Sequence, residues 1–379
     1  MPRYRIFHLL AALPVLAAGP APCRAGTMYL QTNLVSDISG LAAHTDSALK
    51  NPWGISFAPG GPFWVSDERT GLVTLYDGGG NKRGLSVVVP GGKPTGQVFN
   101  STGDFALSGG NPSAFLFATL NGTIAAWGPS LGFGANTQGQ QVVPTSGASY
   151  TGLALGTSAI GSTLYAADNK GGKIDTFNGS FASTPLSGNF ADPNRPSGVT
   201  PYNIQNINGS LYVTWEGPHG TGFLDKFDPD GKVISTFDAP SSMLNQPWGL
   251  ALAPSTFGQF AGDLLVGNKG NGEINAFDPM TGAFKGTLLD AQGKPIVIPG
   301  LWGLAFGGGG KGGNPNSLFF AAGIGPELGA NSGIYQHGLF GEIDPTPEPS
   351  SVILLGLGGM ILVARGWKVR GKRRAFSMT

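Results

Sequence analysis

Asn51-Pro52-Trp53-Gly54-Ile55-Ser56-Phe57 is the stretch that decides the fold, because it recurs as Gln246-Pro247-Trp248-Gly249-Leu250-Ala251-Leu252 and, in part, as Gly300-Leu301-Trp302-Gly303-Leu304-Ala305-Phe306. Apolar and polar positions alternate in these copies, which is the period of a β-strand. A second short run follows the first copy at 63–67 and a third at 72–77, each bounded by Gly, Pro, Asn or Asp. A supersecondary unit that recurs along a chain defines its architecture.

Six such units can be counted, and their first strands are anchored at residues 54, 96, 152, 203, 249 and 303, which lie 42 to 56 residues apart. The predicted second strands are 63–67, 114–119, 163–168, 210–215, 263–268 and 317–322. The predicted third strands are 72–77, 123–127, 173–177, 222–228, 273–278 and 339–343. Units of this length, built from three or four short strands, are typical of β-propellers. The sequence therefore predicts an all-β, six-bladed β-propeller over residues 26–344.

The two ends of this domain are expected to meet in one blade. The last unit stops near Asp344 without a fourth strand, while residues 28–35 alternate like a strand and precede the first unit. We therefore predict that residues 28–35 supply the outer strand of the last blade, which would remove an open sheet edge.

Charge is unevenly distributed along the chain, although the formal net charge is only +1. Between Gly26 and Asp344, 14 basic residues stand against 21 acidic ones, a formal balance of −7. An acidic domain argues against nucleic acid as its partner. The single cysteine, Cys23, lies before this domain, so neither disulfides nor thiol chemistry are expected in it.

The first 25 residues have the features of a secretory signal. Arg3 and Arg5 precede an apolar stretch over 6–18, and small residues and prolines follow up to Ala25. A charged start, a short apolar run and a small-residue end are the parts of a signal peptide, so we predict a signal peptide over 1–25. A weak membrane anchor is the alternative.

The C-terminal 35 residues combine three features in a fixed order. Pro347-Glu348-Pro349 is followed by an apolar stretch over about 351–364 and by a basic tail over 365–374. Fourteen residues at about 1.5 Å each are short for a hydrocarbon core of about 30 Å, so the apolar helix would be a marginal transmembrane helix. The basic tail is expected on the cytoplasmic side.

This order resembles the PEP-CTERM sorting signal of exported proteins in Gram-negative bacteria that produce exopolysaccharide. The resemblance implies that an exosortase at the membrane recognises Pro347-Glu348-Pro349 and removes the rest of residues 345–379. It also implies export to the cell envelope or the outer surface, with transient anchoring through the C-terminal helix. An ordinary tail anchor is the alternative.

The stretch from Leu34 to Gly54 resembles an uncharacterised family of PEP-CTERM-associated propellers, and the resemblance extends over most of residues 30–344. The strand pattern is more distantly similar to NHL-type and lactonase-type propellers. The close family implies a fold and a destination rather than an activity.

Trp53, Trp248 and Trp302 begin three inner strands. They could form an aromatic wall that stacks on sugars. We expect instead that each tryptophan wedges between neighbouring blades as part of the core, while the glycine that follows it allows close approach near the axis.

Asp67, Asp168, Asn169 and Asn268 lie at or just after the ends of predicted second strands. Carboxylate and amide oxygens that converge from several blades are the ligands that Ca²⁺ requires, so these four residues are the candidate ligand or metal site in the channel. The same residue types are also ordinary turn formers. We expect a binding or scaffold module without catalytic residues, with an exopolysaccharide or another envelope component as its partner; the alternative is a metal-assisted hydrolase of the lactonase-like type.

Overall fold

The computed structural model describes residues 27–237, 239, 243–325 and 335–346. The expected signal peptide, Pro347-Glu348-Pro349, the apolar helix and the basic tail therefore lie outside the described residues. Within the described ranges no helix is long and apolar enough to cross a membrane.

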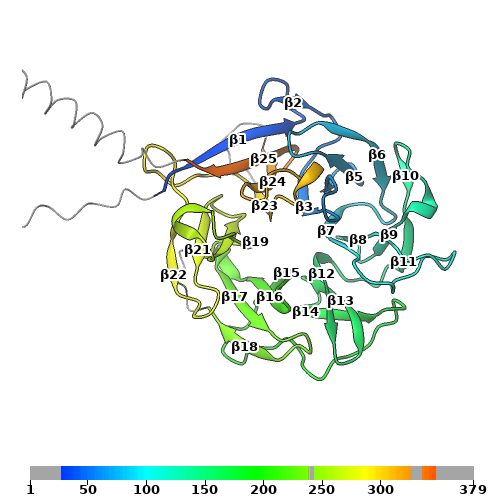
Figure 1. Cartoon of the computed structure of the whole chain (residues 1–379). Helices are drawn as coiled ribbons and strands as arrows, with labels where there is room; N and C mark the ends of the chain where they lie inside the picture. The colour runs from blue at the N-terminus through cyan, green and yellow to red at the C-terminus, as the bar shows by residue number, and fades with distance from the viewer. Residues whose placement is uncertain (1–26, 238, 240–242, 326–334, 347–379) are drawn as a thin grey trace, which may run out of the picture.

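The described residues form six small sheets arranged around a central axis, so the prediction of an all-β, six-bladed propeller is confirmed (Figure 1). We number the sheets blade 1 to blade 6 in chain order. From the axis outward their strands are β3-β4-β5-β6-β10, β7-β8-β9-β11, β12-β13-β14, β15-β16-β17-β18, β19-β20-β21-β22 and β23-β24-β25-β1-β2.

Strand bounds agree closely with the predicted runs. The strands of blades 1 to 3 are β3 (Pro52–Ser56), β4 (Phe63–Asp67), β5 (Leu72–Tyr76), β6 (Lys82–Val88), β10 (Thr137–Gln138), β7 (Pro94–Phe99), β8 (Phe115–Thr119), β9 (Ile124–Trp127), β11 (Gln140–Val143), β12 (Tyr150–Ser158), β13 (Gly161–Asp168) and β14 (Lys173–Asn178). Those of blades 4 to 6 are β15 (Thr200–Ile207), β16 (Ser210–Glu216), β17 (Gly222–Phe227), β18 (Val233–Thr236), β19 (Pro247–Leu252), β20 (Leu264–Asn268), β21 (Ile274–Phe277), β22 (Phe284–Thr287), β23 (Leu301–Phe306), β24 (Leu318–Ile324), β25 (His337–Pro345), β1 (Tyr29–Ser36) and β2 (His44–Thr45).

Short 3₁₀ turns interrupt some of the connecting loops. They are η1 (Pro129–Leu131), η2 (Pro218–Gly220), η3 (Gly258–Phe260) and η4 (Gly310–Gly312). None of them lines the axis, so the inner surface of the propeller is made by strands β3, β7, β12, β15, β19 and β23.

Blade 6 is closed by the beginning of the chain, as predicted. Strand β1 pairs antiparallel with β25, and Tyr29 lies opposite Pro345 at one end of this ladder while Ser36 lies opposite Leu339 at the other. In Figure 1 the blue β1 runs beside the orange β25. Asp37, at the end of β1, accepts hydrogen bonds from Lys50 Nζ (2.7 Å) and the Gly338 amide (2.8 Å), and its Oδ2 lies 2.8 Å from His337 Nδ1.

The core consists of apolar layers between neighbouring blades. Between blades 6 and 1, for example, the rings of Phe63, Phe319 and Phe340 lie with their centroids 4.4 to 5.9 Å apart. Val35 of the closing strand belongs to the same fully buried cluster. Packing of this layer therefore depends on residues from both ends of the chain.

Candidate functional site

The inner strands approach one another closely at a ring of small residues around the axis. A Cβ atom placed on Gly54 would lie 2.5 Å from Thr95 O of the next blade, and one on Gly96 would lie 2.5 Å from Leu153 N. A Cβ atom placed on Gly152, Gly249 or Gly303 would likewise lie 2.4 to 2.5 Å from an atom of the following blade. These are positions at which a larger residue forces the backbone to shift, which confirms that glycine allows close approach near the axis.

Blade 4 is the exception, because its anchor is Asn203 instead of glycine. The Asn203 carboxamide reaches the next blade and donates a hydrogen bond to Trp248 O (2.7 Å). A polar side chain thus replaces direct backbone contact between blades 4 and 5.

The three repeated tryptophans meet at the axis. Trp53 and Trp302 are stacked with their ring centroids 3.5 Å apart, and Trp248 lies edge-on to both at 6.1 and 6.0 Å. Together with Tyr202 they form a buried cluster, which we call the aromatic plug. The structure therefore differs from our expectation that each tryptophan wedges between neighbouring blades, because these rings pack on one another across the axis. At exposures of 2 to 6%, they are also too buried to be an open wall for stacking.

A cavity of about 760 Å³ lies on the axis beside the plug. It is lined by the inner strands and by loop residues at their far ends, including the exposed Ser101 and Gly209 and the half-buried Thr102. Trp248 belongs both to the plug and to this lining, so the plug forms the floor of the cavity. We call the cavity the funnel, the face on which it opens the lower face, and the opposite face, where the inner strands begin, the upper face.

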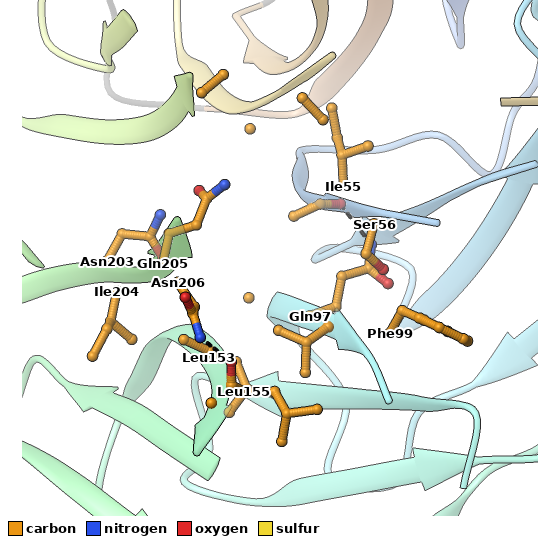
Figure 2. Close-up of a pocket in the computed structure, with 18 of the residues that line it drawn as sticks. Ile55, Ser56, Gln97, Phe99, Leu153, Leu155, Asn203, Ile204, Gln205 and Asn206 are labelled. Atoms are coloured by element: carbon orange, nitrogen blue, oxygen red, sulfur yellow. Dashed lines mark hydrogen bonds between the residues drawn. The ribbon is translucent and has the colours of Figure 1, made fainter. Parts of the chain in front are cut away.

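The funnel has an uncharged lining. Its apolar wall comes from residues such as Ile55, Leu153, Leu155, Ile204 and Leu304, and its polar side chains are hydroxyls and carboxamides (Figure 2). The polar residues of this lining are Ser56, Gln97, Ser101, Thr102, Thr157, Asn203, Gln205 and Asn206.

Several of these polar groups are held by backbone carbonyls of neighbouring strands. Gln97 Nε2 donates to Gly54 O and to Trp64 O, both at 2.7 Å, while Asn206 Nδ2 donates to Leu155 O at 2.8 Å. Gln97 Oε1 and Ser56 Oγ, in contrast, are buried and have no hydrogen-bond partner in the described structure. The Gln205 carboxamide extends into the cavity (Figure 2).

The four residues predicted from sequence lie near the upper face, on the other side of the plug from the funnel. Asp67, Asp168 and Asn268 end the second strands of blades 1, 3 and 5, and Asn169 follows β13. Each of them is hydrogen-bonded to groups of its own or a neighbouring loop or strand. Asp168 Oδ1 accepts from the Ser149 and Gly171 amides at 2.9 Å, and Asn169 Nδ2 donates to Thr200 Oγ1 at 2.9 Å.

Asp67 is fully buried at the end of β4. Its Oδ2 accepts a hydrogen bond from Thr74 Oγ1 (2.7 Å), and its Oδ1 has no partner among the described residues. Burial raises the pKa of this carboxyl well above its ordinary value. Asn268 is also buried, and its Nδ2 donates to Met243 O (3.0 Å).

None of these four residues is hydrogen-bonded to another. The described part of the chain also contains no group of three or more His, Cys, Asp or Glu residues placed to hold a metal ion. The Ca²⁺ site therefore stays a prediction, without an assembled ligand set in the residues that the structure describes.

The structure brings together a different set of groups on the upper face. Gln246 Nε2 donates to Glu216 Oε1, and Gln246 Oε1 accepts from Lys269 Nζ at 3.2 Å. Lys269 Nζ also lies 4.9 Å from the Tyr335 ring centroid and 5.6 Å from that of Trp302. We call Glu216, Gln246 and Lys269 the upper-face network. Its lysine lies next to the plug and makes cation–π contacts with Trp302 and Tyr335.

A matching arrangement lies on blade 1. Asn51 Nδ2 donates to Glu68 Oε2 (2.9 Å), and Asn51 Oδ1 accepts from Trp302 Nε1 (3.1 Å). Asn51 and Gln246 both have left-handed backbones, with φ of 48° and 49°. Both residues begin copies of the repeat, but the sequence does not indicate that their side chains bind charged residues.

The funnel residues were also missed, although a signal for some of them was present. Gln97 directly follows the glycine anchor of blade 2, and Asn203 replaces the anchor of blade 4. In blades 5 and 6 the corresponding positions are Gly-Leu in the Trp-Gly-Leu segment, so a Gln or Asn there is a departure from the apolar pattern. Reading each inner strand in register with its anchor would have identified them.

Comparisons with known proteins relate the chain to other sequences and folds. No model of a protein family matches it. Uncharacterized protein R648 of Acanthamoeba polyphaga mimivirus is 34% identical over 314 residues, which cover 75% of this chain and 75% of that protein. Uncharacterized protein L690 of the same virus is 33% identical over 308 residues, covering 75% of this chain and 80% of that protein.

Among solved structures, one described as "Streptogramin B lyase structure" is similar with a TM-score of 0.50 at 13% identity. The match covers 84% of this chain and 98% of that one. At this identity the similarity shows a common propeller fold. The two viral proteins are much closer in sequence, and the chain therefore belongs to the same family as uncharacterized proteins R648 and L690 of Acanthamoeba polyphaga mimivirus.

Proposed function

We propose that this propeller is a binding module that holds a small uncharged ligand in the funnel. The observation that carries the proposal is a cavity of about 760 Å³ with a closed floor and a lining of apolar, hydroxyl and carboxamide groups. Ligand pockets in proteins commonly enclose about 300–1,000 Å³ and combine apolar walls with a few polar groups that fix orientation. An uncharged lining selects against ions, because an ion would lose its hydration without gaining a partner.

The shape of the site supports binding by a rigid scaffold. The plug closes the floor, and the close glycine contacts together with the Asn203 hydrogen bond hold neighbouring inner strands against one another. A ligand in such a site loses translational and rotational entropy, but its binding does not also require protein loops or side chains to become ordered. Preformed sites of this kind bind with less entropic cost than mobile ones.

A substitution at the mouth of the funnel tests the binding proposal. Thr157 is exposed at the end of β12 and lines the mouth, so Thr157→Trp can narrow the entrance without disturbing the core. We expect a ligand found by screening uncharged metabolites and saccharides to raise the melting temperature of the wild-type chain and not that of the variant. Equal shifts in both proteins would show that the ligand binds elsewhere and would refute a site in the funnel.

We also propose that the chain is exported and that its C-terminal signal is processed by an exosortase, which would leave the propeller at the envelope or the outer surface. The support is the sequence order of Pro347-Glu348-Pro349, the apolar stretch and the basic tail, together with the charged and apolar N-terminal segment. The partner of the exported module would then be an exopolysaccharide or another envelope component.

Processing can be tested directly in a host that has an exosortase. Replacing Pro347, Glu348 and Pro349 by alanine should leave an uncleaved precursor that fractionates with membranes. Alanine at Ser350 and Ser351 is the control, and it should leave processing intact. An unchanged pattern in the triple variant would refute the sorting assignment while leaving the funnel proposal untouched.

The hydrolase alternative has less support. It requires several oxygen ligands that converge on one cation, and Asp67, Asp168 and Asn268 instead bind separate groups in their own surroundings. We therefore base no second function on these residues.

A further inference from the structure

Two opposite walls of the funnel carry carboxamides. Gln97 projects from β7 of blade 2, and beside it lies Ser56 of β3, while Gln205 projects from β15 of blade 4 (Figure 2). Apolar side chains of Leu153, Leu155 and other residues lie between these walls. A ligand on the axis would therefore meet polar groups on two sides and apolar groups between them.

On the wall of blades 1 and 2, the Gln97 carboxamide has no free hydrogen-bond donor. Both hydrogens of the Gln97 carboxamide are used by Gly54 O and Trp64 O, so this side chain offers only its oxygen, which is buried and without a partner. Ser56 Oγ is likewise buried and unpartnered. Leaving a buried polar atom without a partner is unfavourable, and such atoms call for an explanation in a native structure.

A ligand that supplies hydroxyl groups would give these atoms their partners. The oxygen of Gln97 needs a donor, and the Ser56 hydroxyl can turn about a single bond to donate or accept without any movement of the backbone. On the opposite wall, Gln205 offers two donors and an acceptor, and the structure records no hydrogen bond that uses its side chain within the described residues. Ligands with hydroxyls at their edges and C–H groups on their faces fit such alternating surroundings.

We infer that the funnel binds a short neutral saccharide, held by Gln97 and Ser56 on one wall and by Gln205 on the other. The inference rests on the proposed function, because it names the ligand class of the same site. The uncharged lining excludes uronic acids and amino sugars with a free ammonium group, since neither charge would find a counter-ion in the funnel.

A glycan array probed with the full-length chain gives the first test. We expect binding to neutral oligosaccharides and no binding to their carboxylated or sulfated counterparts. Isothermal titration with the best neutral glycan then gives the dissociation constant for each variant. A capped neutral tripeptide serves as a second probe, because it also offers hydrogen-bond donors on a body of similar size.

Ser56→Ala is the critical variant, and Ser66→Ala is its matched control. Ser66 Oγ is also buried and without a partner, but Ser66 lies in β4 and does not line the funnel. Neither change removes a hydrogen bond within the described structure, so both proteins should fold. We expect Ser56→Ala to weaken saccharide binding by about threefold to tenfold, the usual effect of one hydrogen bond, and Ser66→Ala to leave it unchanged.

Gln205→Leu and Gln141→Leu form a second pair. Gln205 lines the funnel, whereas Gln141 is exposed on β11, in an outer strand of blade 2. Saccharide binding should be weakened at least tenfold by the first change and be unaffected by the second. Because the two substitutions are chemically identical, a difference between them reports the position and not the loss of an amide in general.

The possible outcomes separate this inference from the proposed function. Binding of the tripeptide but of no glycan, blocked by Thr157→Trp, would overturn the saccharide and keep the funnel as a binding site. Glycan binding that Thr157→Trp and Ser56→Ala leave unchanged would overturn both, because the sugar would then bind another surface. Preference for acidic glycans would also overturn the inference.

Discussion

Gly96 illustrates how little space a residue has at the axis. Its backbone lies against blade 3, and a Cβ atom at this position would approach Leu153 N to 2.5 Å and Gly152 Cα to 2.7 Å. Both contacts are with backbone atoms of the next inner strand, which cannot turn aside as a side chain can. The glycine is therefore required by packing between blades and not by its backbone angles.

Gly96→Ala should lower the free energy of unfolding by about 1–3 kcal/mol, the usual cost of overpacking a core. Denaturant-induced unfolding followed by tryptophan fluorescence measures the change. Gly84→Ala on β6 is the control, because a Cβ there meets no atom within 4 Å, and its effect should stay within about 0.5 kcal/mol. Equal midpoints for the two variants would show that the ring of glycines is dispensable.

Asp67 is a buried carboxyl whose protonation is linked to stability. Burial raises the pKa of Asp67 in the folded chain well above its value in the unfolded chain. Its favourable contribution is therefore complete below the unfolded pKa of about 3.9 and is lost as the pH rises through the folded pKa. At neutral pH the folded state must either retain a proton there or bury a charge.

Asp67→Asn should consequently stabilise the protein at neutral pH, and the advantage should shrink as the pH falls toward 4. Asn268 shows that asparagine is accommodated at the corresponding end of the second strand in blade 5. Urea unfolding of both proteins at a series of pH values provides the measurement. An advantage that is independent of pH would mean that folding does not raise the pKa of Asp67.

At the scale of the elements, β1 depends on packing as well as on pairing. Val35 is fully buried against Phe63 and Phe340, whereas Leu30 on the same strand is 58% exposed. The strand thus buries Tyr29 at one end and Leu34 and Val35 at the other, while Leu30 is in contact with solvent.

Val35→Ala should destabilise the chain by about 2 kcal/mol, because it leaves a cavity between blades 6 and 1. Leu30→Ala removes more atoms from the same strand but should change stability by less than about 0.5 kcal/mol. Thermal unfolding monitored by circular dichroism compares the two. A larger loss for Leu30→Ala would contradict the described side-chain orientation of β1.

Most elements of the fold could be predicted because the repeats fix their register. Trp53-Gly54, Trp248-Gly249 and Trp302-Gly303 each mark the start of an inner strand, and the strands that follow alternate at the expected spacing. Two short outer strands could not be predicted. Strands β2 and β10 are two-residue segments of loops that pair parallel with an outer strand, and nothing in their own sequence requires this pairing.

The site was harder to predict than the fold, for a physical reason. The sequence shows that Asp67 and Asn268 end strands, but not that one bonds Thr74 and the other the Met243 carbonyl. The funnel is assembled from single residues of several blades, so no local motif contains it. Asp67, Asp168 and Asn268 end the second strands of their blades, and the binding of a ligand or metal by them and Asn169 stays a prediction.

At the scale of the whole molecule, the plug separates two chemically different faces. The funnel on the lower face is uncharged, while the upper-face network contains Glu216 and Lys269. Because Trp53, Trp248 and Trp302 fill the axis between them, a ligand cannot pass from one face to the other without displacing this cluster.

Closure of the ring can be tested with an engineered disulfide. Thr32 of β1 lies directly opposite Glu342 of β25, and opposite residues of antiparallel strands have Cα atoms about 4.5–5.5 Å apart, within the range for a disulfide. In a Cys23→Ser background, Thr32→Cys with Glu342→Cys should raise the free energy of unfolding by about 4 kcal/mol after oxidation, because the bond closes a very long loop.

The reduced double variant is the control, and its stability should return to that of the parent under the same conditions. Mass spectrometry confirms that the bond has formed. If the oxidised and reduced forms unfold at the same denaturant concentration, β1 does not limit the opening of the ring.

The pairing of β1 with β25 also sets the order in which the protein becomes stable during synthesis. The ribosome makes residues 337–345 after every other strand of the propeller, yet these residues are the partner of residues 29–36. Until they emerge, β1 is paired only with the two-residue strand β2, and the ring of blades is open between β1 and β24. A chain that terminates before His337 lacks the strand that joins its two ends, so only a chain translated through Pro345 can acquire the stability of the closed propeller.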